Sequence, residues 1–422
     1  MLTFYVETRI IITLPMADAL VRLFSVVLLC ITAAQGKEQL HSNSEWPKSF
    51  SVIRDTDGIS KVAETQGYTC EEHKATTEDG YILSLQRLPA GQSGKKAHKP
   101  PVLLQHGLFC DAIVWVVNPP DESLGFILAD NGYDVWLANV RGTKYSRGHI
   151  SLHPNDMAYW DWSWDELARY DLPAFVQYVY NQTGQRMHYA GHSLGTLMVL
   201  ADLSRGKLLD MLRSAALLCP IAHLNHVTSP VARTAAQSFI ADPLYWLGLR
   251  EFIPNGDAAS KLVGGICHIL NLINCSNNLL TLITGPNCCL NSSAFNAYLD
   301  HGLPPTATKN LIHLCQMIRT AKIAKYDYGD QRQNMQHYGQ RVPPLYNMTK
   351  ISNEFPLFLT YGRQDALSNV KDVQLLLNDL RDHDGNKLVV LFTEDYSHYD
   401  FIMGVNVNQI IYDPMIVFFE VN

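Results

Sequence analysis

Runs of lysine and arginine are absent from this 422-residue chain, whose 33 basic residues are outnumbered by 40 acidic residues, giving a formal net charge of −7. Nucleic-acid-binding proteins cluster their basic residues on one surface, so this charge pattern argues against a nucleic acid partner. Internal repeats and low-complexity tracts are absent too, which argues against a repeat architecture. A composition of 47% hydrophobic and 17% charged residues suits one large globular domain, or a domain with a large insertion.

A hydrophobic run of membrane-spanning length is also missing, because the apolar residues 23–34 are too few to cross a bilayer comfortably. Arg22 precedes this stretch, and Ala34-Gln35-Gly36 supplies small residues at its end. The pattern is typical of a signal peptide, residues 1–36, that is removed from the mature chain. An uncleaved anchor is the alternative. Met16 is an alternative start, which would make residues 1–15 an upstream extension.

Sequences of the form N-x-S/T are candidate glycosylation sites, and they occur at Asn181, Asn274, Asn291 and Asn347. The nine cysteines do not by themselves fix the redox compartment. Together with the signal peptide, the four sites predict a glycosylated protein of the secretory pathway, either extracellular or lysosomal. No transmembrane span is expected in the mature chain.

Continuous apolar runs predict the buried strands of a mostly parallel sheet. They are residues 101–105, 133–138, 187–190, 215–219, 356–361 and 387–392. The Asp79-Gly80 turn predicts an antiparallel hairpin whose second strand is residues 81–88. No clear strand pattern occurs from residue 220 to residue 346, where amphipathic helical stretches predict an insertion between two strands of one sheet.

Residues 191–195, with the sequence Gly-His-Ser-Leu-Gly, stand between the predicted strand 187–190 and a predicted helix over residues 196–203. Strand, G-x-S-x-G and helix form a nucleophile elbow, a turn so sharp that side chains at positions 191 and 195 would collide with neighbouring backbone. We therefore expect Gly191 and Gly195 to be required, and Ser193 to adopt a strained conformation with its hydroxyl exposed. The alternative is an ordinary turn serine.

A serine hydroxyl becomes nucleophilic only when an oriented base removes its proton. In chains with this elbow the acid follows a late strand and the histidine follows the last one. Asp365 follows the predicted strand 356–361, and His398 follows the predicted strand 387–392. The sequence predicts His398 as the general base and Asp365 as its orienting carboxylate. The rival acids are Asp372, Asp395 and Asp400.

Two backbone N–H groups are needed to stabilise the negative charge that develops on an oxygen during nucleophilic attack on a carbonyl group. One is expected from Leu194, which follows the nucleophile. The other is expected from Leu108, in the loop after the strand 101–105. His106 lies in the same loop and is an alternative base, but its place before Gly107 favours a scaffolding role.

Six motifs together resemble the acid lipase family, which includes gastric lipase, lysosomal acid lipase and many insect lipases. They are Leu104-Gln105-His106-Gly107-Leu108, Asn139-Val140-Arg141-Gly142, residues 165–174, Tyr189-Ala190-Gly191-His192-Ser193, residues 325–329 and residues 396–401. The resemblance runs from about residue 48 to the C-terminus. It implies an α/β-hydrolase fold, with a mostly parallel central sheet, helices on both faces and an inserted helical cap. It also implies hydrolysis of triacylglycerols or sterol esters at an oil–water or membrane interface, with no cofactor and no metal.

Two departures from the family pattern are visible. The family usually has glutamine after the nucleophile, where this chain has Leu194, so a backbone donor is kept and a side-chain contact is lost. The resemblance also implies a cap disulfide between Cys267 and Cys275. Cys288 and Cys289 stand where the family commonly has one cysteine; because adjacent cysteines rarely bond to each other, we expect one to pair elsewhere or stay free.

The predicted organisation is a signal peptide (1–36), a first part of the core (37–219), the cap or lid (220–346) and a second part of the core (347–422). The predicted function is a secreted or lysosomal lipase that works through an acyl-enzyme. Two alternatives stay open. One is an esterase for smaller soluble esters, against which the large apolar cap argues. The other is a non-catalytic lipid-binding protein on the same fold.

Overall fold

A nine-stranded sheet forms the centre of the computed structural model, which describes residues 58–254, 256, 264–265 and 279–422. All of these lie in one of the two units into which the chain divides, Val52–Asn422. The predicted signal peptide, the sequon at Asn274 and the cysteines Cys267 and Cys275 lie outside the described residues. In the described part, no helix is both long and apolar enough to cross a membrane.

The order of strands along the sheet is β1-β2-β4-β3-β6-β7-β10-β11, with β5 paired to β2. Their bounds are β1 (Glu71–Thr76), β2 (Tyr81–Leu88), β3 (Pro101–Gln105), β4 (Asp134–Ala138), β5 (Gly148–His149), β6 (Met187–His192), β7 (Leu212–Leu218), β10 (Leu357–Gly362) and β11 (Leu388–Thr393). All neighbours from β4 to β11 pair in parallel, while β2 is antiparallel to β1, β4 and β5. The predicted strands and the hairpin at Asp79-Gly80 are confirmed.

Both faces of the sheet are buried, as its continuous apolar strands require. Side chains of a strand alternate between faces, so Leu103 enters one core and its neighbours Val102 and Leu104 enter the other. The first core is completed by α5 (Leu172–Thr183), α6 (Leu194–Leu203) and α14 (Val370–Asp379). The second is completed by α2 (Ile59–Thr65), α3 (Leu124–Asp130), α15 (Asp400–Met403) and α16 (Asp413–Val421). The predicted mostly parallel central sheet, with helices on both faces, is confirmed.

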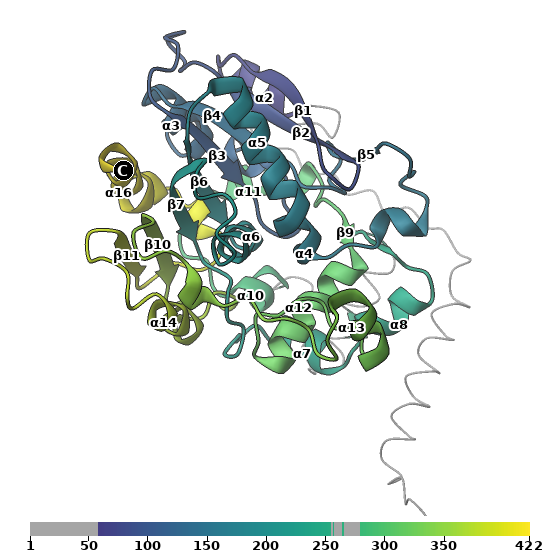
Figure 1. Ribbon diagram of the computed structural model, residues 1–422. Helices are drawn as coiled ribbons and strands as arrows, with labels where there is room; N and C mark the ends of the chain where they lie inside the picture. The colour runs from purple at the N-terminus through teal and green to yellow at the C-terminus, as the bar shows by residue number, and fades with distance from the viewer. Residues whose placement is uncertain (1–57, 255, 257–263, 266–278) are drawn as a thin grey trace, which may run out of the picture. The chain divides into compact units, whose positions relative to one another are not determined.

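Between β7 and β10 the chain is mainly helical. Among the residues that the structure describes, the α-helices of this segment are α7 (Pro230–Gln237), α8 (Ala241–Trp246), α10 (Leu279–Thr284), α11 (Ser292–Asp300), α12 (Thr308–Thr320) and α13 (Gln331–Tyr338). Figure 1 shows α7, α12 and α13 grouped below the sheet, and α12 packs against α7 and α8. Two short strands, β8 (Glu251–Phe252) and β9 (Thr306–Ala307), pair within this segment, so the expectation that it lacks strands is wrong.

Candidate active site

Ser193 occupies the turn between β6 and α6, with backbone angles φ 55° and ψ −117°. A non-glycine residue in this region is strained, and the surrounding contacts maintain the strain. A Cβ at position 191 would lie 2.9 Å from the Gly195 carbonyl carbon, and one at position 195 would lie 2.7 Å from the Gln105 oxygen. Neither position has room for a larger residue, because its side chain would collide with neighbouring atoms, as expected for this turn.

Three side chains form a continuous hydrogen-bond chain at this turn. His398 Nε2 lies 2.8 Å from Ser193 Oγ, and His398 Nδ1 lies 2.8 Å from Asp365 Oδ2. Asp365 follows β10 and His398 follows β11, so the parallel strands bring both to the same edge of the sheet as Ser193. All three are buried, with only 8% of Ser193 exposed.

Backbone contacts orient the two partners of Ser193. Asp365 Oδ1 accepts hydrogen bonds from the N–H groups of Leu367 and Ser368, both at 2.8 Å, which leaves Oδ2 directed at His398. The His398 carbonyl accepts a hydrogen bond of 2.9 Å from Nε2 of His192. Burial lowers the pKa of His192 to about 3, so its ring stays neutral and adds no charge beside His398.

The rival acids are exposed or bound to other groups. Asp395 is exposed, and Asp372 accepts hydrogen bonds from the backbone N–H and the Nδ1 of His226. Asp400 accepts hydrogen bonds from three backbone N–H groups, of Ser397, Cys288 and Cys289. Their hydrogen bonds, unlike that of Asp365, do not reach the His398 ring.

The predicted oxyanion loop lies beside Ser193. A Cβ at position 107 would lie 2.9 Å from Ser193 Cβ, so this glycine allows the loop that carries Leu108 to approach the serine closely. Leu194 is the first residue of α6, and its N–H group therefore has no acceptor within the helix. His106 Nδ1 donates to the Gly107 oxygen at 2.8 Å and Nε2 accepts from Val140 N at 3.2 Å, which places His106 in the scaffold.

Comparison with known proteins connects this geometry to a family. A family model described as "alpha/beta hydrolase fold" matches residues 100–404, and one described as "partial alpha/beta-hydrolase lipase region" matches residues 59–119. Triacylglycerol lipase 2 of Arabidopsis thaliana is 46% identical over 358 residues, covering 84% of this chain and 85% of that protein. The chain belongs to the α/β-hydrolase lipase family.

Animal members of this lipase family are similar over the same range. Lipase member K of Homo sapiens is 37% identical and gastric triacylglycerol lipase of Homo sapiens is 35% identical, each covering 86% of this chain and 90% of the relative. The resemblance to acid lipases is confirmed, and the chain is a carboxylic ester hydrolase.

Solved structures support the fold of this lipase-family chain. The soluble variant of monoglyceride lipase from Saccharomyces cerevisiae superposes with a TM-score of 0.53 at 14% identity, covering 84% of this chain and 96% of that one. A thermostable carboxyl esterase from Bacillus coagulans gives a TM-score of 0.51 at 12% identity, with 84% and 98% covered. At such identities the likeness concerns the fold alone.

Sequence reasoning did not identify Phe109 and Tyr298 as parts of this lipase-family site. Phe109 follows the expected oxyanion donor Leu108 and has a positive φ of 57°. Its carbonyl oxygen accepts a hydrogen bond of 2.7 Å from the hydroxyl of Tyr298, which belongs to α11. The contact depends on how the segment between β7 and β10 packs on the core, and no local sequence signal reports such packing.

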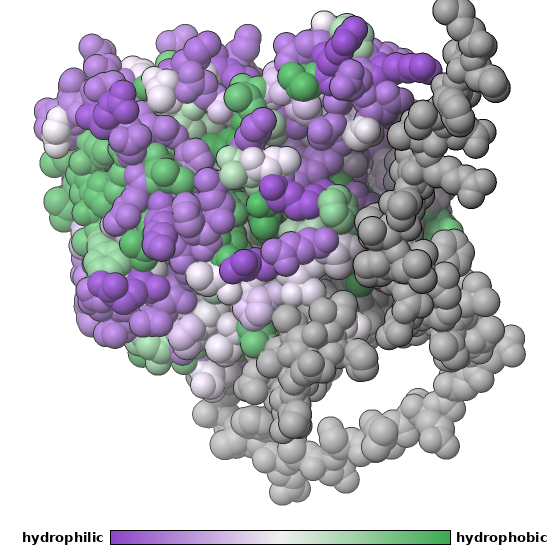
Figure 2. Space-filling view, turned by 90° about the horizontal axis from the view of Figure 1, so that it is seen from below, coloured by the Kyte–Doolittle hydropathy of each residue, from purple (hydrophilic) through white to green (hydrophobic). Residues whose placement is uncertain are grey.

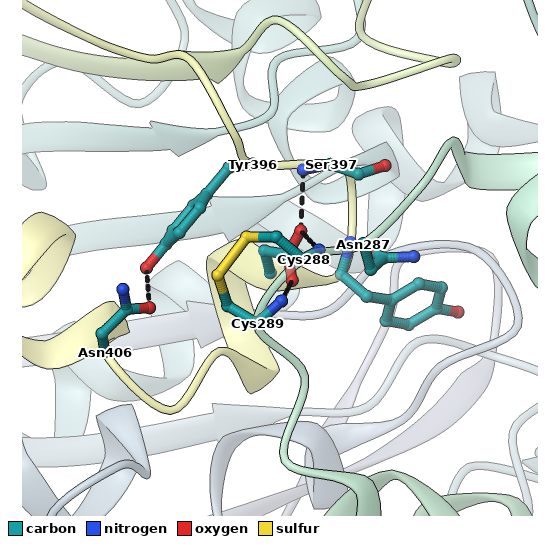
Figure 3. Close-up of a disulfide and its surroundings, with 8 residues drawn as sticks. Asn287, Cys288, Cys289, Tyr396, Ser397 and Asn406 are labelled. Carbon is teal, nitrogen blue, oxygen red and sulfur yellow. Dashed lines mark hydrogen bonds between the residues drawn. A yellow bond between two sulfur atoms is a disulfide. The ribbon is translucent and has the colours of Figure 1, made fainter.

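Cys288 and Cys289 form a disulfide with each other, so the expectation that one pairs elsewhere or stays free is wrong. Figure 3 shows this bond beside Asn287 and Ser397. The backbone N–H groups of both cysteines donate to one carboxylate, that of Asp400, at 3.1 and 3.0 Å. This shared acceptor favours the tight local turn that brings the two sulfurs together.

Three of the four candidate glycosylation sites lie in the described part of the chain. Asn181 and Asn347 are exposed. Asn291 caps α11, and its amide nitrogen donates to Glu122 at 2.8 Å. A glycan at Asn291 would have to displace that bond, so Asn181 and Asn347 are the more accessible candidates.

Proposed function

We propose that this chain is a lipase that hydrolyses triacylglycerols or sterol esters through an acyl-enzyme on Ser193. The observation that carries the proposal is the hydrogen-bond chain from Ser193 through His398 to Asp365. His398 takes the hydroxyl proton as Ser193 Oγ attacks the ester carbonyl, and Asp365 stabilises the imidazolium that forms. His398 then protonates the leaving alcohol, and water releases the fatty acid by the same route.

The backbone N–H groups of Leu108 and Leu194 are the proposed oxyanion hole. They would donate to the negatively charged oxygen of each tetrahedral intermediate, and each such donor contributes about 3 kcal/mol to lowering the barrier. Leu194 begins α6, whose N-terminus adds a favourable partial positive charge. Gly107 contributes by allowing the loop to lie against Ser193.

A lipid substrate is supported by the relatives, which are named as triacylglycerol lipases, and by apolar surface near the segment between β7 and β10. Trp246 and Leu247, at the end of α8, are 71% and 70% exposed, and Met157 beside them is 61% exposed. Figure 2 shows apolar patches between polar residues on the face that includes α7 and α12. Exposed apolar surface suits contact with an insoluble substrate.

We further propose that residues 220–346 act as a cap that must open, because Ser193 is nearly buried and an insoluble ester must reach it. The apolar stretches of this cap include residues 262–266, which lie largely outside the described residues, and residues 279–283 in α10, which are partly exposed. Export through the secretory pathway, to the extracellular space or the lysosome, is proposed from the signal-peptide pattern and the sequons.

One experiment separates this function from its alternatives. Wild type and Ser193→Ala are compared on a soluble short-chain ester and on emulsified long-chain triacylglycerol and cholesteryl ester, with labelling by a serine-directed phosphonate. We expect a higher rate on the emulsified lipid, labelling of the wild type alone, and a loss in Ser193→Ala of more than about 100-fold. Preference for the soluble ester would favour the esterase alternative, whereas a folded, active Ser193→Ala would remove the nucleophile assignment.

A further inference from the structure

A short segment between β7 and β10, residues 284–291, lies between the loop that carries Asp365 and the loop that carries His398. We call it the bridging segment. The Thr284 carbonyl oxygen accepts a hydrogen bond of 2.9 Å from the N–H group of Ala366 and one of 2.6 Å from Ser397 Oγ. Ala366 follows Asp365, and Ser397 precedes His398. One carbonyl oxygen therefore connects the two loops.

Two further residues of the bridging segment contact these loops. Gly285 has φ +96°, and a Cβ there would overlap the Gln364 carbonyl oxygen. The Asn287 side chain accepts a hydrogen bond of 3.1 Å from the N–H group of Tyr399, directly after His398. The segment thus reaches the Ser397 hydroxyl before His398, the Tyr399 backbone after it, and the backbone before and after Asp365.

Asp400 forms hydrogen bonds with the second half of the bridging segment. Its carboxylate is buried and accepts the N–H groups of Ser397, Cys288 and Cys289 at 2.8, 3.1 and 3.0 Å. Backbone donors of this kind satisfy a buried carboxylate. Two of the three donors belong to consecutive residues, whose N–H groups point apart in an extended chain. The Cys288–Cys289 disulfide closes a small ring through the intervening peptide and restricts its rotation, so both groups stay directed at Asp400.

We propose that Asp400 and the bridging segment are positioning groups for the triad, and that the Cys288–Cys289 disulfide locks them, so that a dithiol reductant lowers turnover. This inference rests on the proposed roles of Ser193, Asp365 and His398. In the reduction, the S–S bond breaks, each cysteine sulfur gains a hydrogen from the dithiol, and the dithiol becomes a cyclic disulfide. A disulfide oxidant such as oxidised glutathione reverses the exchange.

The expected effect falls on turnover and not on binding. Reduction frees the peptide between Cys288 and Cys289, which weakens the hold of Asp400 on the loop that carries His398. A displacement of about 1 Å in a catalytic group can cost about 100-fold in rate. Since part of the segment's contacts would survive, we expect kcat on a soluble short-chain ester to fall about tenfold, with KM changed less than about twofold.

The test uses three full-length proteins, each assayed as oxidised and as dithiol-treated enzyme, with mass spectrometry to establish which disulfides have opened. They are the wild type, Cys288→Ala with Cys289→Ala, and Cys267→Ala with Cys275→Ala. We expect the wild type to lose about tenfold in kcat on reduction and to recover on reoxidation. The 288/289 variant should be slow in both states, and the 267/275 variant should keep the dithiol response of the wild type.

Counting the active sites separates positioning from a general structural effect. If the disulfide positions His398, kcat per phosphonate-titrated site should be about tenfold lower in the 288/289 variant. That variant changes no carboxylate or histidine. A loss of stability alone would lower the number of titrated sites and leave kcat per site unchanged.

The proposal is overturned if the bond is shown to be open and kcat per titrated site is unchanged, or if the 288/289 variant equals the oxidised wild type. Should that variant fail to fold, Asp400→Asn provides the second measurement, because it keeps the disulfide and removes acceptor capacity; unchanged kcat there also overturns the proposal. Failure of the proposed function itself would look different, since Ser193→Ala would then remain active whatever the state of the disulfide.

Discussion

The two carboxylate oxygens of Asp365 have different hydrogen-bond partners. Oδ1 accepts two backbone N–H groups of its own loop, and Oδ2 faces the His398 ring. The loop bonds fix the direction of the side chain, because a carboxylate held at one oxygen has little freedom at the other. Replacing one oxygen with an NH2 group would place a donor where an acceptor is needed.

Asp365→Asn should therefore lower kcat by about 10⁴-fold, as when a triad histidine is held in the wrong tautomer. Asp395→Asn is the matched control, since Asp395 is an exposed aspartate in the loop after β11 that carries His398, and its kcat should stay close to that of the wild type. Rates on a soluble ester, divided by the amount of folded enzyme, provide the measurement. A larger loss in Asp395→Asn than in Asp365→Asn would contradict the assignment.

At this scale the sequence identifies the residues whose role follows from their place in the chain. Ser193, Asp365 and His398 each follow a strand whose apolar run is readable, and parallel strands bring their ends together. Tyr298, Thr284 and Asp400 act through contacts with residues more than eighty positions away, apart from the Asp400 bond to Ser397. Such contacts depend on tertiary packing, which leaves no local pattern in the sequence.

Arg141 joins three separate elements of the core. It lies after β4, its guanidinium makes two hydrogen bonds to Asp79 in the β1–β2 turn, at 2.6 and 2.8 Å, and its Nε donates to Asp171 at 2.7 Å. Asp171 ends a π-helical turn, Leu167–Asp171, just before α5. Arg141 and Asp171 are both buried, so removing the cation would leave a carboxylate without its counter-charge.

Arg141→Gln should lower the free energy of unfolding by about 3–5 kcal/mol, the range found when one partner of a buried ion pair is removed. Arg363→Gln is the control, because Arg363 pairs with Glu394 at an exposed position and its loss should leave the unfolding midpoint unchanged within error. Urea unfolding followed by circular dichroism measures both. Equal midpoints for the two variants would mean that the buried pair does not join these elements.

Whether the sequence predicts a strand depends on the length of the strand and on the continuity of its apolar run. The central strands were predicted because each is an unbroken apolar run, and all residues of β3 and β4 are buried. β7 begins at Leu212, three residues before the start of the predicted strand, because Arg213 and Ser214 interrupt the apolar pattern. The strands β8 and β9 have two residues each and carry no periodicity, so only their pairing in space reveals them.

Buried neutral histidines influence the stability of the whole molecule. Burial lowers the pKa of His188 and His192 to about 3 and that of His313 to about 4. In the unfolded chain a histidine titrates near about 6.5, so the unfolded state binds protons first as the pH falls. Each of these groups therefore stabilises the fold fully above that value and loses its contribution as the pH falls towards its folded pKa.

The free energy of unfolding should consequently fall between pH 7 and pH 5, by about 2 kcal/mol for each such histidine. His188→Gln tests one of them, because glutamine can keep a hydrogen bond to Ser214 without titrating. Urea unfolding at both pH values should show a smaller pH dependence in this variant than in the wild type. An identical pH dependence in the two proteins would contradict the assignment of His188 as buried and neutral.

The insertion between β7 and β10 also sets the order in which the chain can be completed during synthesis. These strands are neighbours in the sheet but lie far apart in the chain, because β7 ends at Leu218 and β10 ends at Gly362. At about 5–20 residues per second, a ribosome needs on the order of ten seconds to make the intervening chain. Throughout that interval one edge of β7 has no partner, and an unpaired apolar edge is a template for aggregation. The nascent chain must therefore be protected at β7, by its own newly made helices or by a chaperone, before any hydrolytic site can exist.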